Sequence, residues 1–291
     1  AVGMGMGMAG IGMAVMHDAV HGSTSSHAWM NKILGGTMYL LGTNVFNWRI
    51  QHNIMHHTHT NINEVDQDID SRGLLRFSEH ARLKWVHRFQ HFHAFFFYGL
   101  LTITKLVNDF FMLAHFTRIG LTRKHKVDPT LEFVAMSGVK AGHLFVFIGL
   151  PLIFTALAWW QILLGFFIMH FVCGVILGTV FQLAHVVEGA EQPLPNAEGV
   201  IARSWAVHEV RTTADFARNN RLLNWYIGGL NFQIEHHLFP HICHVHYPKI
   251  APIVERTALE HGLVYNLKPS LAAALGSHVR RLKQLGRMSV P

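Results

Sequence analysis

The longest uninterrupted apolar pattern in this chain covers residues 141–187. These 47 residues contain no Asp, Glu, Lys or Arg, and two membrane-spanning helices need about 40 residues. The pair Trp159-Trp160 lies near the middle of the run, and tryptophan is enriched where a membrane meets water. The pattern predicts a helical hairpin with spans at about 141–159 and 161–185 and a turn near Gln161.

A shorter uncharged run opens the chain at residues 1–16. It has fewer than the roughly 20 residues that cross a bilayer core, and it lacks the basic start of a signal peptide. We expect it to be the end of a spanning helix whose beginning lies upstream. Residues 1–291 would then form a single membrane domain with a truncated N-terminus.

Two further apolar stretches are interrupted. Residues 33–48 are uncharged, but the stretch is short for a membrane span and contains Gly35-Gly36. Residues 92–116 form a longer stretch but carry Lys105 and Asp109. We expect both stretches to lie at the membrane surface or to re-enter the membrane. The basic amphipathic tail from about residue 270 is also expected to lie along that surface.

Composition and charge support a membrane protein with a defined orientation. Half of the residues are hydrophobic and 14% are charged, against about 25% charged in ordinary soluble domains. Every Lys and Arg lies in residues 17–140 or 188–291, which places both segments on the cytoplasmic side. The net charge of +7 suits anionic lipids better than nucleic acid, because no basic stripe with interleaved aromatic residues occurs.

The cysteines do not suggest a metal or disulfide site. Cys173 and Cys243 are far apart and form no C-x-x-C motif. The predicted fold is therefore an all-α integral membrane protein, with transmembrane helices and a cytoplasmic helical cap.

Histidine is the most unusual component, since the chain has 24 histidines against 17 acidic residues. Three clusters have the spacing of helix-borne metal ligands: His17 and His21; His52, His56 and His57; Gln233, His236 and His237. Residues three or four apart share one face of a helix, so we expect His52 and His56 to share a face. Adjacent residues point about 100° apart, so adjacent histidines can serve two metal ions.

His185 ends the last predicted span on the same side as the clusters. It brings the number of candidate ligands to eight histidines, enough for two metal ions if water or Gln233 completes the coordination. The E-x-x-H pairs of carboxylate di-iron bundles do not occur in the sequence. An imidazole-rich site suits iron, whereas zinc, the alternative, has no redox chemistry.

Ligating imidazoles need hydrogen-bond acceptors that fix the ring orientation. The candidates beside the clusters are Asp18, Asn53, Asn61 and Glu235. The acidic residues at positions 64–70 either add to them or form a solvated loop. The remaining histidines are not expected to be ligands: His87, His91 and His93 on an aromatic helix, His170 about 22 Å from His185 along a helix, and the bracing His241, His244 and His246. His59 is expected to contact the residues that surround the ligands.

The motifs His-Asp-Ala-Val-His-Gly, His-Asn-Ile-Met-His-His-x-x-Thr-Asn and Gln-Ile-Glu-His-His-Leu-Phe-Pro resemble the three histidine boxes of membrane fatty acid desaturases. The resemblance covers residues 10–260 approximately, with the family's order and spacing. Gln233 stands where many members have a histidine. This feature resembles the front-end subgroup, which inserts a double bond between an existing one and the carboxyl end of the acyl chain.

The resemblance implies an O2-dependent fatty acyl desaturase with a di-iron centre on the cytoplasmic face. The site residues that it carries over are His17, His21, His52, His56, His57, His185, His236 and His237. The substrate would be an acyl-CoA or acyl-lipid, and two electrons would come from an external donor. The His-Pro-Gly-Gly motif of a fused cytochrome domain is absent from the sequence. We therefore expect either a separate b-type cytochrome or ferredoxin, or a donor domain that lay in the missing N-terminus.

Two other functions compete with this interpretation. An acyl hydroxylase or other oxygenase on the same scaffold shares the first hydrogen abstraction, and the histidine motifs do not separate the two reactions. A histidine-rich metal transporter would place its ligands near the bilayer midplane. The clusters here lie at span ends and in the cytoplasmic segments, which disfavours transport.

Overall fold

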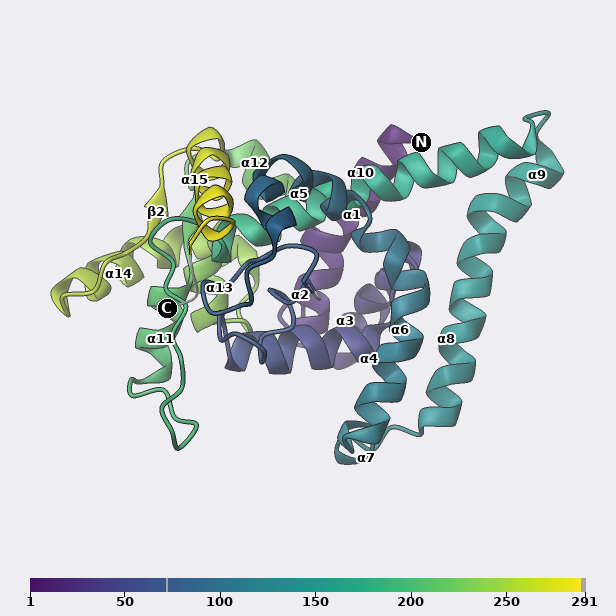
Figure 1. Ribbon diagram of the computed structural model, residues 1–291. Coiled ribbons are helices and arrows are strands. Elements are labelled where there is room, and N and C mark those ends of the chain that lie inside the picture. Colours follow the sequence, from purple (N-terminus) through teal and green to yellow (C-terminus); the bar gives the residue numbers. More distant parts are fainter. Residues whose placement is uncertain (72, 289–291) are drawn as a thin grey trace.

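The computed structural model describes residues 1–71 and 73–288 and is mostly helical (Figure 1). The N-terminal part contains α1 (Val2–Ile11), η1 (Gly12–Met16), α2 (His17–His21), α3 (Ala28–Gly35), η2 (Gly36–Leu41), α4 (Val45–Trp48) and η3 (Arg49–His56). The middle part contains η4 (Trp85–Phe89), α5 (Gln90–Gly99), α6 (Leu101–Arg118), α7 (Leu121–Lys124), α8 (Pro129–Leu144), η5 (Phe145–Gly149), α9 (Leu150–Phe154) and α10 (Trp159–His185). The C-terminal part contains α11 (Trp205–Thr212), β1 (Asp215–Phe216), α12 (Arg221–Tyr226), α13 (Gln233–Leu238), η6 (His244–His246), α14 (Tyr247–Glu260), β2 (Leu267–Lys268) and α15 (Leu271–Leu285).

The start of the chain is one nearly continuous helix, because α1, η1 and α2 follow one another without a break. It packs along α10, and its buried Met13 belongs to the same apolar cluster as Cys173. The helix ends at Gly22, whose φ of 77° is the left-handed conformation that glycine adopts readily. The uncharged run 1–16 therefore continues directly into the turn that carries the first two candidate ligands.

Two helices of the described chain are long and apolar enough to cross a membrane. They are Pro129–Phe154, which joins α8, η5 and α9 and has 26 residues, and α10, which has 27. Figure 1 shows them as an open hairpin with α9 at the outer edge of the molecule; α10 runs from there into the body, and α8 runs back beside α6. The number of spans rises to three if η4–α5 and α6, which are bent by 72° to each other, count as one.

This hairpin begins and turns earlier than the uncharged run predicts. Its first helix starts at Pro129 because Asp128 accepts hydrogen bonds from two backbone N–H groups of the first turn, and proline suits that position. Lys140, whose charge limited the uncharged run, is neutralised by the Asp109 carboxylate 2.9 Å away. The turn occupies residues 155–158, so that Trp159 is the first residue of α10.

The interrupted stretches form short or bent helices. Residues 33–48 include the end of α3, all of η2 and all of α4. Residues 92–116 cover most of α5 and α6, on either side of their bend. Their position at a membrane surface stays a prediction.

The C-terminal elements gather on the side of the molecule away from the hairpin tip (Figure 1). β1 and β2 pair in parallel, with Asp215 opposite Leu267 and Phe216 opposite Lys268. The amphipathic tail forms α15, whose apolar side packs against α5 and α10.

Candidate metal centre

The histidine clusters, which lie up to 220 residues apart in the chain, meet in one buried region. The first group contains His17, His21, His52 and His236; the second group contains His56, His185 and His237. Within each group, one potential ligand atom from every residue lies within 4.8 Å of the others. The helices α2, η3, α10 and α13 supply these side chains.

His57 lies between the two groups. Its ring centroid is 4.7 Å from that of His21 and 4.4 Å from that of His237. Both of its ring nitrogens are buried without a hydrogen-bond partner among the described residues. All eight predicted histidines are therefore brought together, with seven in two compact groups and His57 between them.

The fit of these residues to metal ions rests on unpartnered nitrogen atoms. The buried imidazole nitrogens without a hydrogen-bond partner among the described residues include His21 Nε2, His236 Nε2 and His237 Nε2, and both nitrogens of His185. His17 Nε2 and His52 Nε2 face each other at 3.2 Å. Leaving a buried polar atom unpaired costs about 1–3 kcal/mol. So many convergent lone pairs fit a bound cation better than an empty protein interior.

Adjacent histidines serve different groups. His236 belongs to the first group and His237 to the second, because neighbouring helical residues point in different directions. His52 and His56 remain neighbours, with ring centroids 5.1 Å apart. They nevertheless divide between the two groups, and η3, which carries both, is π-helical.

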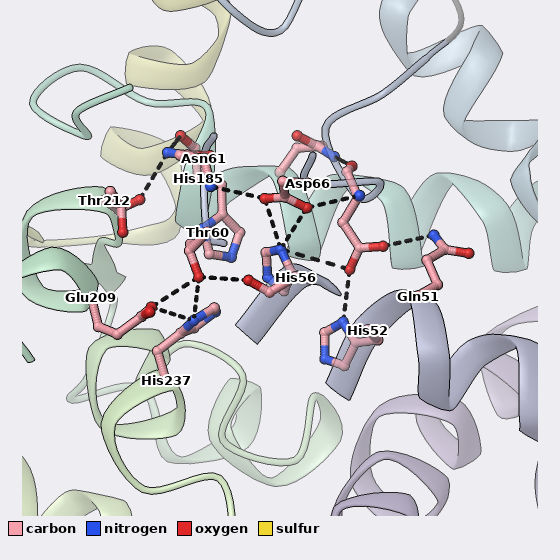
Figure 2. Close-up of polar contacts among 12 residues, drawn as sticks. Gln51, His52, His56, Thr60, Asn61, Asp66, His185, Glu209, Thr212 and His237 are labelled. Carbon is pink, nitrogen blue, oxygen red and sulfur yellow. Dashed lines mark hydrogen bonds and ion pairs between the residues drawn. The ribbon is translucent and has the colours of Figure 1, made fainter. Parts of the chain in front are cut away.

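Carboxylates of the acidic loop orient the η3 histidines. Asp68 Oδ2 lies 2.7 Å from His52 Nδ1, and Asp66 Oδ2 lies 2.9 Å from His56 Nδ1 (Figure 2). In each case the carboxylate accepts a hydrogen bond from Nδ1 and leaves Nε2 as the nitrogen that could bind a metal. The acidic loop is therefore part of the site.

Two further groups orient the α13 histidines. Glu209 Oε2 lies 2.9 Å from His237 Nδ1 and also accepts a hydrogen bond from Thr60 (Figure 2). The hydroxyl of Tyr247 lies 3.2 Å from His236 Nδ1. Sequence reasoning missed Glu209, Thr60 and Tyr247 as orienting residues, since none lies in a recognisable motif and only the fold brings them to the rings.

Burial and nearby charge give the histidines different proton affinities. Burial lowers the pKa of His57 and His237 well below the usual value, so both are neutral and available to a metal. Burial also lowers that of His56, but the Asp66 and Asp68 carboxylates outweigh it and raise the pKa of His56 to about 9. A cation at His56 would therefore have to displace a proton.

The first two predicted orienting residues contact different parts of the site: one contacts histidine rings and the other contacts the backbone. Asp18 Oδ2 lies 2.8 Å from Nδ1 of His244, and Asp18 Oδ1 lies 3.8 Å from His17 Nδ1. The amide of Asn53 donates to the backbone carbonyl of Val20 at 3.1 Å, so it supports the α2 backbone.

The other two predicted orienting residues brace the backbone around the site. Asn61 Nδ2 donates to the carbonyl oxygens of His185 and Thr212 at 3.0 and 2.9 Å. Glu235 Oε1 accepts from the Tyr265 hydroxyl at 2.8 Å. Gln233 is buried, and its Nε2 has no hydrogen-bond partner among the described residues.

His170 lies apart from the two groups, as its distance along α10 predicts. Its Nε2 is 3.0 Å from Nε2 of His143, and its Nδ1 is 3.0 Å from the Thr102 hydroxyl. These contacts belong to the packing between α6, α8 and α10.

Comparison with known proteins agrees with this geometry. The model of the family described as "Fatty acid desaturase" matches residues 1–269. A "sn-1 linoleoyl-lipid 6-desaturase" from Synechocystis is 36% identical over 289 residues, which are 98% of this chain and 79% of the relative. A protein of the same name from Arthrospira platensis is 35% identical, with 97% of this chain and 76% of the relative covered.

A third relative is longer. An "Acyl-lipid (8-3)-desaturase" from Physcomitrium patens is 36% identical over 98% of this chain but only 60% of its own length. No solved structure has a significant match to the chain. The family match and these relatives extend over nearly all of the sequence, and the chain therefore belongs to the fatty acid desaturase family, oxidoreductases that act on fatty acyl chains.

Proposed function

We propose that this desaturase uses two iron ions, held by the two histidine groups, to insert a double bond into a lipid-bound acyl chain. The observation that carries the proposal is the convergence of unpartnered imidazole nitrogens in two adjacent buried groups. Neither group needs a carboxylate ligand, which suits iron in an imidazole-rich environment. When bound, the iron would supply the reaction with O2 that removes two hydrogens from adjacent methylenes.

The residues of the chain have separable tasks in this reaction. The first group would hold one ion and the second group the other, with His57 between them as a ligand for either. Asp66, Asp68 and Glu209 would keep the Nδ1 protons in place so that the Nε2 lone pairs face the metal. Burial of the groups keeps bulk water away from the reacting carbon.

The substrate class is inferred from the relatives and from Gln233. The names of the three relatives all specify lipid-bound acyl chains, and two of them specify linoleoyl-lipid, which already contains double bonds. We therefore favour an acyl-lipid over an acyl-CoA. Gln233, which stands in place of the first histidine of the third motif, supports the front-end type, in which the new double bond lies on the carboxyl side of an existing one.

The reaction also needs a reductant and an orientation in the membrane. O2 accepts two hydrogens from the substrate, two electrons from a donor and two protons, and yields two water molecules. We assign the electrons to a separate b-type cytochrome or ferredoxin on the cytoplasmic side. The location of all Lys and Arg outside residues 1–16 and 141–187 supports this side for the metal centre.

The test combines lipid analysis with metal analysis. A host that expresses the protein should accumulate acyl chains with one additional double bond, detected by mass spectrometry, and the purified protein should contain two iron ions per chain. His56→Ala and His237→Ala should abolish the new double bond while the protein remains in the membrane. The exposed His261 provides the matched control, and His261→Ala should have wild-type activity.

Two results would contradict the proposal. Stoichiometric zinc, with activity that survives removal of iron, would exclude the iron centre. A hydroxylated acyl chain as the main product would identify an acyl hydroxylase on the same scaffold.

A further inference from the structure

Helix α6 carries a lysine that is not paired with the nearest acid. Lys105 is half-buried, and a charged group in an apolar helix is costly unless it is paired. Asp109 lies one turn further along, but its Oδ2 is already engaged by Lys140 Nζ at 2.9 Å and by the backbone N–H of Asn44 at 2.9 Å. Lys105 Nζ instead donates to Gln51 Oε1 at 2.7 Å.

This contact is the outer end of a chain of hydrogen bonds that reaches the first histidine group. Gln51 Nε2 donates to Asp68 Oδ1 at 2.7 Å, and Asp68 Oδ2 lies 2.7 Å from His52 Nδ1. Figure 2 shows Gln51 and His52 linked in this way through one carboxylate. Three bonds therefore connect the Lys105 ammonium to a candidate metal ligand.

The ammonium group and the carboxylate together determine the direction of every bond in the chain. An ammonium can only donate, so Gln51 must present its oxygen to Lys105 and its N–H to Asp68. An ionised carboxylate can only accept, so the proton of His52 must be on Nδ1. The lone pair is then on Nε2, the atom that faces His17 Nε2 at 3.2 Å.

We propose that Lys105 and Gln51 are positioning residues, which hold the Asp68 carboxylate in place and through it the orientation of His52 as a metal ligand. The inference rests on the proposed metal centre, and it concerns only the ion of the first group. It assigns a role to the lysine that interrupts the apolar pattern of residues 92–116. The pairing of Lys140 with Asp109 leaves Lys105 free for this role.

A comparison with the second group explains why His52 needs this support. The carboxylates that orient His56 and His237 have fully buried side chains, whereas the side chain of Asp68 is 21% exposed. A partly exposed carboxylate can rotate towards water unless a second contact holds it. Asp68 Oδ2 also lies 3.9 Å from His56 Nδ1, so the bond from Gln51 favours His52 as its partner.

The test measures metal binding, with activity as a second readout. Purified metal-free protein would be titrated with Fe²⁺ under anaerobic conditions, and with Co²⁺ for its ligand-field absorption. Gln51→Glu preserves size and still accepts from Lys105, but it has no N–H for Asp68. It should weaken one of the two binding steps about 10–100-fold, the range for loss of a group that supports a ligand, and leave the other step unchanged.

The lysine is tested in parallel. Lys105→Met should weaken the same binding step, because the Gln51 amide can then rotate by about 180° and present its oxygen, instead of its N–H, to Asp68. Arginine also has only hydrogen-bond donors, so Lys105→Arg should keep this binding step close to that of the wild type. The exposed Lys124 serves as the matched control, and Lys124→Met should bind both ions as the wild type does.

The outcomes separate the inference from the proposed function. Wild-type affinity at both steps in Gln51→Glu and Lys105→Met would overturn the positioning role while the metal centre stands. Equal weakening of both steps would also overturn it, because that result indicates a general loss of structure. A wild-type protein that desaturates lipid without binding either ion would overturn the metal centre itself, and the inference with it.

Discussion

Histidines that are adjacent in the sequence of this protein point in different directions. His56 and His57 are adjacent in sequence, as are His236 and His237, yet the two members of each pair face different parts of the centre. A short helix that carries two adjacent imidazoles can thereby contribute to two metal sites. The acidic partners then differ from ring to ring, so that individual ligands can be tested separately.

Glu209 provides the first test at this scale. Burial raises the pKa of Glu209 to about 8, although the hydrogen bond from Thr60 opposes the shift. A cation bound at His237 would favour the ionised carboxylate, because opposite charge stabilises it. Glu209→Gln retains the size but loses this charge, and we expect metal affinity at the second group to fall at least about 10-fold in a Fe²⁺ titration. Glu198→Gln, on an exposed residue, should change nothing.

Gln233 provides the second test. Its amide is buried on the same helix as His236, with Nε2 unpartnered among the described residues. An amide oxygen is a poorer iron ligand than imidazole, so we expect it to orient a bound water or substrate rather than to hold the ion. Gln233→Leu should lower turnover strongly while most of the iron is retained. Wild-type turnover in this variant would identify Gln233 as a packing residue and weaken the front-end assignment.

At the scale of elements, the close contact between α5 and α10 depends on glycine. A methyl group at Gly174 would lie 2.5 Å from the Tyr98 carbonyl oxygen and 2.7 Å from that of Gly99. Gly174→Ala should therefore destabilise the protein by about 1–3 kcal/mol, the usual cost of overpacking, and lower the thermal midpoint in detergent. Gly165 lies in the same helix with nothing within 4 Å of its added methyl group, so Gly165→Ala should not lower the midpoint.

The attachment of α15 should depend on pH. His278 Nδ1 donates to the Val186 carbonyl at 2.7 Å and Nε2 lies 2.9 Å from the Tyr98 hydroxyl, while burial lowers the pKa of His278 to about 4. The unfolded chain binds this proton below about pH 6.5, but the folded protein does not until about pH 4. Stability is therefore lost as the pH falls through this window, by up to about 3 kcal/mol.

This pH effect is measured by comparing chemical unfolding at pH 7.5 and 4.5. The His278→Gln variant cannot titrate at this position, so its stability should fall less over the same range. An equal fall in both proteins would show that other groups cause the pH dependence.

At the scale of the whole molecule, the proposed metal centre requires both flanking segments on one side of the membrane. The two-helix hairpin leaves and returns, so residues 17–128 and 188–291 should share a side. Single cysteines at Glu64 and Glu198, both exposed, should be labelled from the cytoplasm in a background without Cys173 and Cys243. A cysteine at Leu157, in the turn of the hairpin, should be labelled from the opposite side. Labelling of Glu64 and Glu198 from opposite sides would be incompatible with a shared site.

The sequence alone determined the class of this protein and the identity of its candidate ligands. Composition and long uncharged runs indicate membrane helices, because the apolar bilayer core admits few charges and requires about 20 residues per span. The spacing of the histidines indicates ligation, because residues three or four apart share a helical face. Both are local properties, because they depend only on residues that are close together in the sequence. The three histidine motifs likewise identify the family.

Only the tertiary structure decided how those ligands are divided and held. Asp66 and Asp68 could equally form a solvated loop until the fold places them beside η3. Glu209 and Lys105 act on residues more than 25 positions away in the chain, where sequence spacing carries no geometric information. Lys140 can lie inside the first helix of the hairpin because the fold places the Asp109 carboxylate 2.9 Å from its ammonium group. A charge in an apolar helix is neutralised only by a partner that the fold brings to it.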